Sequence, residues 1–217
     1  KAMPTRTNGS LNRLKNISKE ADFPRKMTCS ILIVTKNRAE DLALTLEAMR
    51  HVHLPDSLRL ELIVIDNGST DHTAEVVESC NCGKIEVRYI NEPKPGKCTG
   101  LNRGLAESVG DIILFTDDDV RPSEDWIPRM CEPIIEGKGD AVSGGVSLAP
   151  HLVRPWMTSV HRSWLAATDW LEKGSSHSMV GANMAFSRRV LDKVPGFDPE
   201  LGPGASGFGD DTLFASQ

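Results

Sequence analysis

The sequence predicts a single-domain α/β fold with a mainly parallel sheet flanked by helices. Short apolar segments alternate along the chain with segments of helical pattern, as in successive βαβ units. A length of 217 residues is enough for one such domain with a sizeable core, and too short for two ordinary domains. Because 39% of the residues are hydrophobic, the composition is neither that of a disordered nor that of a fibrous chain.

The expected strands are short apolar or alternating runs, and most of them are followed by an amphipathic helix. The strands are expected at residues 30–35, 60–65, 84–90, 111–115, 141–148 and 179–186. The helices are expected at residues 39–50, 71–79, 97–108, 122–135 and 156–171.

Polar clusters follow three of the expected strands. They are Thr35 to Arg38, Asp66 to Gly68, and Asp117 to Asp119. The carboxyl ends of parallel strands meet at one edge of the sheet, and open α/β sheets bind ligands in the crevice outside that edge. The sequence therefore predicts a ligand site where these three clusters converge.

Two common nucleotide-binding motifs are missing from this edge. No Gly-x-Gly-x-x-Gly follows the first strand, and Gly96-Lys97 is followed by Cys98 and lacks the earlier glycine of a P-loop. A diphosphate then needs another counter-charge, which a divalent cation held by Asp117 to Asp119 can supply. A solvated acidic turn is the alternative, but the position of the triplet directly after an apolar strand favours the metal.

The overall charge and the cysteines limit the class of partner. With 25 basic and 30 acidic residues the formal charge is -5, which argues against a general nucleic-acid binder. The five cysteines have an odd count and irregular spacing, unlike a disulfide framework. Cys80 and Cys82 lack a second pair at zinc-site spacing. These features fit a reducing cytoplasm.

Residues 1–28 are expected to form a basic N-terminal arm. Leu11, Leu14 and Ile17 are spaced for one helical face, so the arm is either flexible or a helix that docks on a partner or at the inner face of a membrane. No apolar run approaches the ~20 residues of a membrane span, and no secretory signal is visible. Because the chain begins with Lys1, a tag remnant or an excised fragment is expected.

Six segments, taken in order, resemble the motifs of the family-2 glycosyltransferases of GT-A fold. Residues 31–38 resemble the first strand and turn of that family, and 62–71 its "VVDDGSTD" segment, with Asn67 in place of the second Asp. The others are 100–104 ("ARNxG"), 111–119 (Asp-x-Asp), 181–186 ("GxNxAF") and 209–212 ("GED"). The resemblance implies a GT-A, Rossmann-like catalytic domain at 29–217, truncated at its C-terminus.

The resemblance also implies an activity. The expected enzyme is an inverting glycosyltransferase that moves a sugar from a nucleotide diphosphate donor, expected to be a UDP-sugar, to an acceptor hydroxyl with the help of Mn²⁺ or Mg²⁺. The acceptor is expected to be a carbohydrate, a lipid-linked or another hydroxyl compound, as in cell-wall or polysaccharide biosynthesis. The sugar, the acceptor and the pathway are not readable from the residues.

Individual roles follow from the matching positions. The residues implied to bind the nucleotide are Thr35, Asn37, Arg38, Asp66, Lys97, Asn102, Asp117 and Asp118. Asp66 would accept the N3–H of uracil or thymine, since adenine and cytosine offer no such ring N–H. Asp119, helped by Asp117, would bind the metal, although the division of roles between Asp118 and Asp119 stays open. Lys97 either approaches a phosphate or is simply solvated.

Asp211 is expected to be the general base that removes the acceptor proton. The alternative is that Asp210, which replaces the usual Glu, and Asp211 only cap the last helix. The glycine-rich segment 201–209 is either a lid beside this pair or an ordinary surface loop.

Trp156, Trp164 and Trp170 could stack on a sugar, but Trp156 and Trp164 share a helical face with Val160 and Leu171, which favours packing in the core. His161 has no evident partner and is not expected to bind metal.

Two other functions compete with this one. A sugar nucleotidyltransferase should carry a glycine-rich, arginine-containing loop after its first strand, and residues 35–38 contain no glycine. A catalytically inactive, transferase-like scaffold is the other alternative. The intact Asp66, Asp117, Asp119 and Asp211 argue against it.

Overall fold

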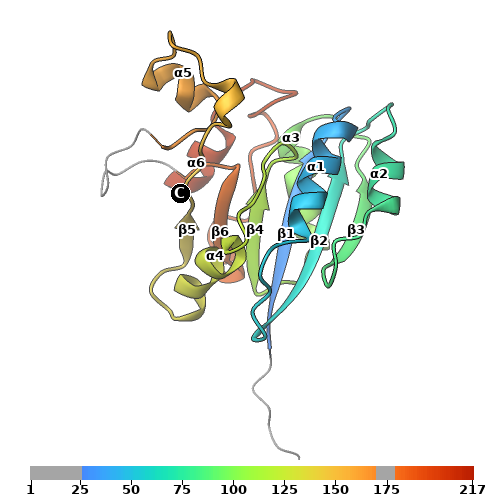
Figure 1. Cartoon of the computed structure of the whole chain (residues 1–217). Coiled ribbons are helices and arrows are strands. Elements are labelled where there is room, and N and C mark those ends of the chain that lie inside the picture. The colour runs from blue at the N-terminus through green and yellow to red at the C-terminus, as the bar shows by residue number, and fades with distance from the viewer. Residues whose placement is uncertain (1–25, 170–178) are drawn as a thin grey trace, which may run out of the picture.

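The sheet at the centre of the molecule has six strands, and helices cover both of its faces (Figure 1). A computed structural model describes residues 26–169 and 179–217 of the chain. The strands are β1 (Met27–Thr35), β2 (Leu58–Asp66), β3 (Glu86–Asn91), β4 (Ile112–Thr116), β5 (Ala141–Ser143) and β6 (Asn183–Ser187). The helices are α1 (Ala39–Met49), α2 (Thr73–Ser79), α3 (Lys97–Glu107), α4 (Trp126–Ile135), α5 (Ser159–Trp164) and α6 (Asp210–Ser216), with short 3-10 helices η1 (Pro150–Leu152) and η2 (Arg188–Asp192).

The strand order is β3-β2-β1-β4-β6-β5. Strands β3, β2, β1 and β4 are parallel neighbours, whereas β6 runs antiparallel to both β4 and β5. The predicted mainly parallel α/β fold is therefore confirmed. Thr35 at the end of β1 lies opposite Asp66 at the end of β2, so the carboxyl ends of these strands are level.

Successive strand residues point to opposite faces of the sheet, and each face has its own hydrophobic core. Ile31 and Ile33 of β1 pack with α1, α2 and α4 on one face. Leu32, together with Phe115 and Phe186, packs with α3 and α6 on the other. Because both faces are covered, the central strands read as continuous apolar runs in the sequence.

Several predicted boundaries differ from the observed ones. β1 begins at Met27, inside the expected arm, because Met27 already pairs with Leu58 of β2. The strand expected at 141–148 ends at Ser143, where two glycines follow. The helix expected at 156–171 is reduced to α5 because Ala166 adopts a left-handed conformation with φ 57° that ends it.

Some sequence predictions lie outside the described residues. These include the structure of residues 1–25 and the position of Trp170 and Leu171.

The five cysteines are free thiols, and two pairs of sulfurs, Cys29 with Cys131 and Cys80 with Cys82, lie 3.9 Å apart. Within the described ranges, no helix combines the length and the apolar character that a membrane crossing requires.

Candidate active site

The three polar clusters predicted from the sequence converge at the carboxyl edge of the sheet. Thr35 and Asp66 are opposite each other in the β1·β2 pairing, and Asp117 to Asp119 follow directly after β4, the other neighbour of β1. The edge thus gathers side chains from segments that are far apart in the sequence.

The three aspartates of the triplet point in different directions. Asp117 accepts a 2.7 Å ion-paired hydrogen bond from Lys97 Nζ at the start of α3. Asp118 turns back towards the sheet, where it is 5% exposed and accepts a 2.8 Å hydrogen bond from Thr35 Oγ1. Asp119 stays half-exposed and pairs with Arg38 at 2.8 Å. Asp118 therefore stabilises the end of β1, whereas Asp117 and Asp119 face outwards.

The charges at this edge perturb one another. Burial raises the pKa of Asp118, against the opposing effects of Thr35 and Arg38. Burial alone would lower the pKa of Lys97, but the negative charge of Asp117 outweighs it and the pKa is raised. Lys97 is therefore an ion-paired ammonium group at the edge of the sheet rather than a solvated surface lysine.

Arg38 is the centre of an ion-pair network. Besides its contact with Asp119, its guanidinium lies 3.0 Å from Asp41 and 3.4 Å from Asp118. The sequence analysis assigned Arg38 to the nucleoside. In the structure the guanidinium of Arg38 is directed to the acidic cluster instead. A sequence motif could not reveal this contact, because Asp41 lies on the following helix.

Asp66 is buried, and both of its carboxylate oxygens have hydrogen-bond partners within the protein. It is 3% exposed, and its oxygens accept 2.7 Å hydrogen bonds from the Ser69 backbone N–H and from the Tyr89 hydroxyl. Burial, followed by the hydrogen bond to Asp66, raises the pKa of Tyr89 to about 12. Asp66 thus holds the turn after β2 and anchors β3.

Asn67 has a structural role that the sequence analysis recognised only as a departure from the family pattern. Its Nδ2 donates to the carbonyls of Glu92 and Lys94 at 3.1 and 2.7 Å, and its Oδ1 accepts from the Gly96 N–H at 2.9 Å. These three bonds fix the loop between β3 and α3.

Asn37 joins two turns at the edge. It adopts a positive φ of 52°, a conformation that asparagine tolerates better than most residues. Its Oδ1 accepts from the Thr70 N–H at 2.7 Å, and its own N–H donates to Ser69 Oγ at 2.8 Å. The contacts of Asn37 are thus with the turn after β2.

Asn102, which the resemblance places among the nucleotide-binding residues, has a different role in the structure. Its Nδ2 donates to the Phe197 carbonyl and its Oδ1 accepts from the Phe197 N–H, both at 2.8 Å. The side-chain carboxamide thus donates to and accepts from the backbone of one residue, as the backbone of a neighbouring β-strand would. Asn102 lines a separate hollow together with residues such as Leu191 and Gly196, and its contact with the nucleotide stays a prediction.

Two neighbouring cavities lie at the edge. The smaller one, about 390 Å³, is lined by the end of β1, Asn67, the loop to α3 and Asp118. The larger one, about 620 Å³, is lined by Phe115, Trp164 and the start of α6. Val34, Lys97, Asp117 and Pro203 line both cavities. The Lys97–Asp117 pair therefore lies at the boundary between them.

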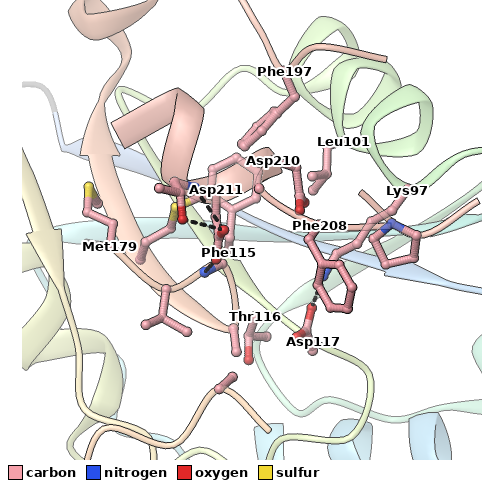
Figure 2. A pocket seen from close by; sticks show the side chains of 18 of the residues that line it. Lys97, Leu101, Phe115, Thr116, Asp117, Met179, Phe197, Phe208, Asp210 and Asp211 are labelled. Carbon is pink, nitrogen blue, oxygen red and sulfur yellow. Dashed lines mark hydrogen bonds and ion pairs between the residues drawn. The ribbon is translucent and has the colours of Figure 1, made fainter. Parts of the chain in front are cut away.

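Asp210 and Asp211 face the larger cavity across from this pair (Figure 2). Asp211 Oδ2 accepts a 3.0 Å hydrogen bond from the Gly181 N–H, and its Oδ1 accepts from the Thr212 N–H at 2.8 Å. Burial raises the pKa of Asp210, with Lys97 opposing the shift. One carboxylate is thus fixed by backbone donors, and the other has an increased proton affinity.

The tryptophans in and just before α5 are not in the core, and that part of the sequence prediction is wrong. Trp156, which precedes the helix, is 64% exposed, and Trp164 at its end is 71% exposed. His161 does have partners: it lies between the two tryptophan rings and accepts a hydrogen bond from Thr158. Trp164 and the exposed Phe208 both line the larger cavity.

The donor groups at the edge fit a divalent cation that binds together with a diphosphate. Among the described residues, no three His, Cys, Asp or Glu side chains gather into a complete metal site. Mg²⁺ is often held by only one or two carboxylates and completes its shell with phosphate oxygens and water. Asp117 and Asp119 supply two such carboxylates, each already beside a cationic side chain.

Comparisons with known proteins show the family of this chain. Residues 30–195 match the family described as Glycosyl transferase family 2. The probable glycosyltransferase YdaM of Bacillus subtilis is 27% identical over 179 residues, which cover 78% of this chain and 42% of that protein.

Two solved structures are similar in fold. Glucosyl-3-phosphoglycerate synthase from Mycobacterium tuberculosis in complex with UDP has 26% identity and a TM-score of 0.51, covering 76% of this chain and 58% of that one. The mannosyltransferase PcManGT from Pyrobaculum calidifontis, in complex with GDP-Man and Mn²⁺, has 22% identity and a TM-score of 0.62, covering 88% and 51%.

The chain spans about half the length of these relatives. The family match nevertheless covers most of the chain, including β1, the turn after β2, α3, the aspartate triplet and β6. With its GT-A fold and this match, the chain belongs to glycosyl transferase family 2.

Proposed function

We propose that this domain is the catalytic part of an inverting, metal-dependent glycosyltransferase that uses a UDP-sugar and an acceptor hydroxyl. The observation that carries the proposal is the pair of neighbouring cavities, both of which Lys97 and Asp117 line. The smaller cavity would hold the nucleoside, the boundary the diphosphate, and the larger cavity the sugar and the acceptor.

The nucleoside would lie against Thr35, Arg38 and Asn67, which line the smaller cavity. Lys97 would donate to a phosphate oxygen in exchange for part of its contact with Asp117, and Asp117 would then be free to accept from the ribose. A divalent cation, Mn²⁺ or Mg²⁺, held by Asp119 with help from Asp117 would neutralise charge on the departing diphosphate.

The acceptor would be activated in the larger cavity. A hydroxyl is a weak nucleophile until its proton is removed, and Asp211 is the proposed base. Its carboxylate is held by Gly181 at the start of the segment that leads into β6, so it is fixed in the cavity wall. One in-line displacement, with attack on the side opposite the diphosphate, would invert the anomeric carbon.

The choice of uracil rests on Asp66 and on the relatives. A ring N–H would reach Asp66 Oδ2 by displacing the Tyr89 hydroxyl, which now donates to it at 2.7 Å. The glucosyl-3-phosphoglycerate synthase structure contains UDP, whereas the mannosyltransferase structure contains GDP-Man and Mn²⁺. The family match gives no support to the alternative of a sugar nucleotidyltransferase.

Thermal unfolding with nucleotides tests the proposal. A ligand that binds only the folded state raises the melting temperature, so UDP with Mn²⁺ should stabilise the protein more than ADP with Mn²⁺. Asp119→Asn keeps the shape but removes a charge, and it should abolish the part of the UDP effect that depends on Mn²⁺.

Asp118→Asn is the matched control for the metal assignment, since Asp118 faces Thr35. Equal stabilisation by UDP and ADP would contradict base recognition at Asp66, and stronger stabilisation by GDP would indicate a guanosine donor. A UDP effect that EDTA leaves unchanged would overturn the metal assignment. Donor binding without any turnover of a panel of UDP-sugars would support the inactive-scaffold alternative.

A further inference from the structure

An exposed apolar surface lies beside the larger cavity and shares one residue, Trp164, with the lining of that cavity. It consists of Leu152, Val153, Trp156, Val160, Trp164 and Leu165, hereafter the α5 patch. Of the eleven large hydrophobic side chains exposed in the described residues, these six lie within one short segment. Such a concentration marks an interaction surface rather than ordinary surface scatter.

The charge of this segment differs from that of the rest of the chain. The sequence has 30 acidic residues, yet neither Asp nor Glu occurs between Ala141 and Thr168. Exposed basic groups lie within the same segment, at His151 and Arg154. Arg154 donates to nearby backbone carbonyls and forms no ion pair with any described residue. An apolar surface beside an arginine without an acidic partner fits an anionic, apolar partner.

The aromatic part of the α5 patch is held in a fixed arrangement. His161 lies edge-on to Trp156 and Trp164, with ring centroids 5.3 and 5.4 Å away. Thr158 binds His161 through its backbone N–H at 3.2 Å and its hydroxyl at 2.8 Å. The array therefore loses little side-chain entropy on binding. Tryptophan is enriched at the boundary between lipid headgroups and hydrocarbon.

The position of α5 connects this surface to the site. In Figure 1 α5 projects beyond the end of the sheet at which β1 and β4 terminate. Trp164 belongs both to the α5 patch and to the lining of the larger cavity, and Phe208, 82% exposed, lines that cavity as well. A surface bound to the α5 patch would thus lie next to the opening through which an acceptor enters.

We propose that the α5 patch docks the domain on an anionic lipid surface and presents the larger cavity to acceptors at that surface. The aliphatic members Leu152, Val153 and Leu165 favour lipid over a soluble sugar, because a sugar-binding platform needs polar groups to match the hydroxyls. The docking is independent of the proposed function, whereas the use of acceptors at the lipid surface rests on it.

Vesicle binding tests the docking. The whole chain should co-sediment with vesicles of equal parts phosphatidylcholine and phosphatidylglycerol, and less with phosphatidylcholine alone. Leu152→Ser combined with Trp156→Ser should weaken binding by about tenfold or more. Arg154→Glu should weaken it about fivefold or more, in line with the effect of one basic residue near an anionic surface.

Matched controls change exposed residues elsewhere. Leu44→Ser combined with Val109→Ser removes two exposed apolar side chains far from α5 in the sequence, and Arg129→Glu reverses an exposed charge on α4; both should leave binding unchanged. Brominated lipids should quench the tryptophan fluorescence of the bound protein, since two of its four tryptophans belong to the α5 patch, whereas Trp126 is buried and Trp170 lies outside the described residues.

Three results would overturn the docking. One is vesicle binding without quenching, which would assign the contact to the basic N-terminal arm. Another is equal loss of binding in the α5 and control variants. The third is an absence of vesicle binding together with one of two other results. These are a fluorescence change on addition of soluble oligosaccharides, or a self-association that the Leu152→Ser and Trp156→Ser double variant loses. None of these results depends on UDP stabilisation, so failure of the docking and failure of the proposed function are distinguishable.

Discussion

Arg38 carries a positive charge at the position where a metal ion is proposed to bind. Its guanidinium lies 2.8 Å from Asp119, the main proposed metal ligand, and 3.4 Å from Asp118. A divalent cation at Asp119 would therefore have to displace Arg38, unless both cations share the carboxylate. The displaced side chain is long enough to turn towards the smaller cavity, which it already lines.

Replacing this arginine should change metal binding in a predictable direction. Arg38→Met removes the competing charge at similar length, so Mn²⁺ should bind roughly two- to fivefold more tightly without nucleotide, the range of an exposed ion pair. Isothermal titration calorimetry with Mn²⁺ alone measures this. Arg121→Met is the control, since Arg121 contacts Asp41 rather than Asp119. Weaker Mn²⁺ binding in Arg38→Met would contradict the competition.

The two carboxylates at the start of α6 should differ in their effect on transfer. Asp211→Asn retains an oxygen for the Gly181 N–H, so the fold should persist while transfer, or slow donor hydrolysis by water, falls by roughly 10² or more. UDP and metal binding should be unchanged, because a base acts on the acceptor. Asp210→Asn should have the smaller effect; the reverse order would identify Asp210, whose pKa burial raises, as the base.

At the scale of elements, α3 shows how closely a helix can approach the sheet. An added Cβ at Gly100 would lie 2.8 Å from Val34 Cγ1, and one at Gly104 would lie 2.9 Å from Ile65 Cδ1. These glycines bring the start of α3, and with it Lys97, against the ends of β1 and β2. The glycines were quoted in the sequence only as part of a motif, whereas their function is packing.

Alanine at Gly100 should therefore destabilise the fold. Although alanine favours a helix by about 1 kcal/mol over glycine, the contact with the stiff, β-branched Val34 should outweigh this, for a net loss of about 1–3 kcal/mol. Urea unfolding of Gly100→Ala measures the change. Gly139→Ala is the control, since its Cβ would meet only the Ala141 carbonyl at 3.6 Å. A free energy of unfolding equal to that of the control variant would show that the Val34 side chain moves to accommodate the added Cβ.

The limits of the sequence predictions also appear at this scale. The apolar strands β1, β2 and β4 were predicted because burial on both faces leaves a continuous signature. The short α5 was overestimated, since helical spacing of tryptophans cannot show that Ala166 turns into a left-handed conformation. The partner of Asn102, the backbone of Phe197, was not predictable, because a local motif carries no signal of a residue that lies far along the chain.

At the scale of the whole molecule, the alternation of strands and helices predicted the parallel half of the sheet, and the antiparallel insertion of β6 was not predictable. β6 pairs with β4 so that Asn183 lies opposite Thr116. This reversal brings Gly181, just before β6, to the carboxyl edge, where it binds Asp211. Nonlocal strand pairing of this kind leaves no periodic signal, so the meeting of β6, α6 and the aspartate triplet emerges only in three dimensions.

Asn67 and Gly68 give the protein a route of chemical ageing. In an Asn-Gly pair the glycine nitrogen can attack the side-chain amide carbon, which releases ammonia and forms a succinimide that water then opens to Asp or isoaspartate. The bonds from Asn67 Nδ2 to Glu92 and Lys94 should slow this reaction while the turn is folded. Isoaspartate at this position would lengthen the backbone of the turn and release the loop that carries Pro95 and Gly96 along the smaller cavity. Stored protein should therefore lose UDP binding before it loses its fold, in step with the deamidated Asn67 peptide found by mass spectrometry.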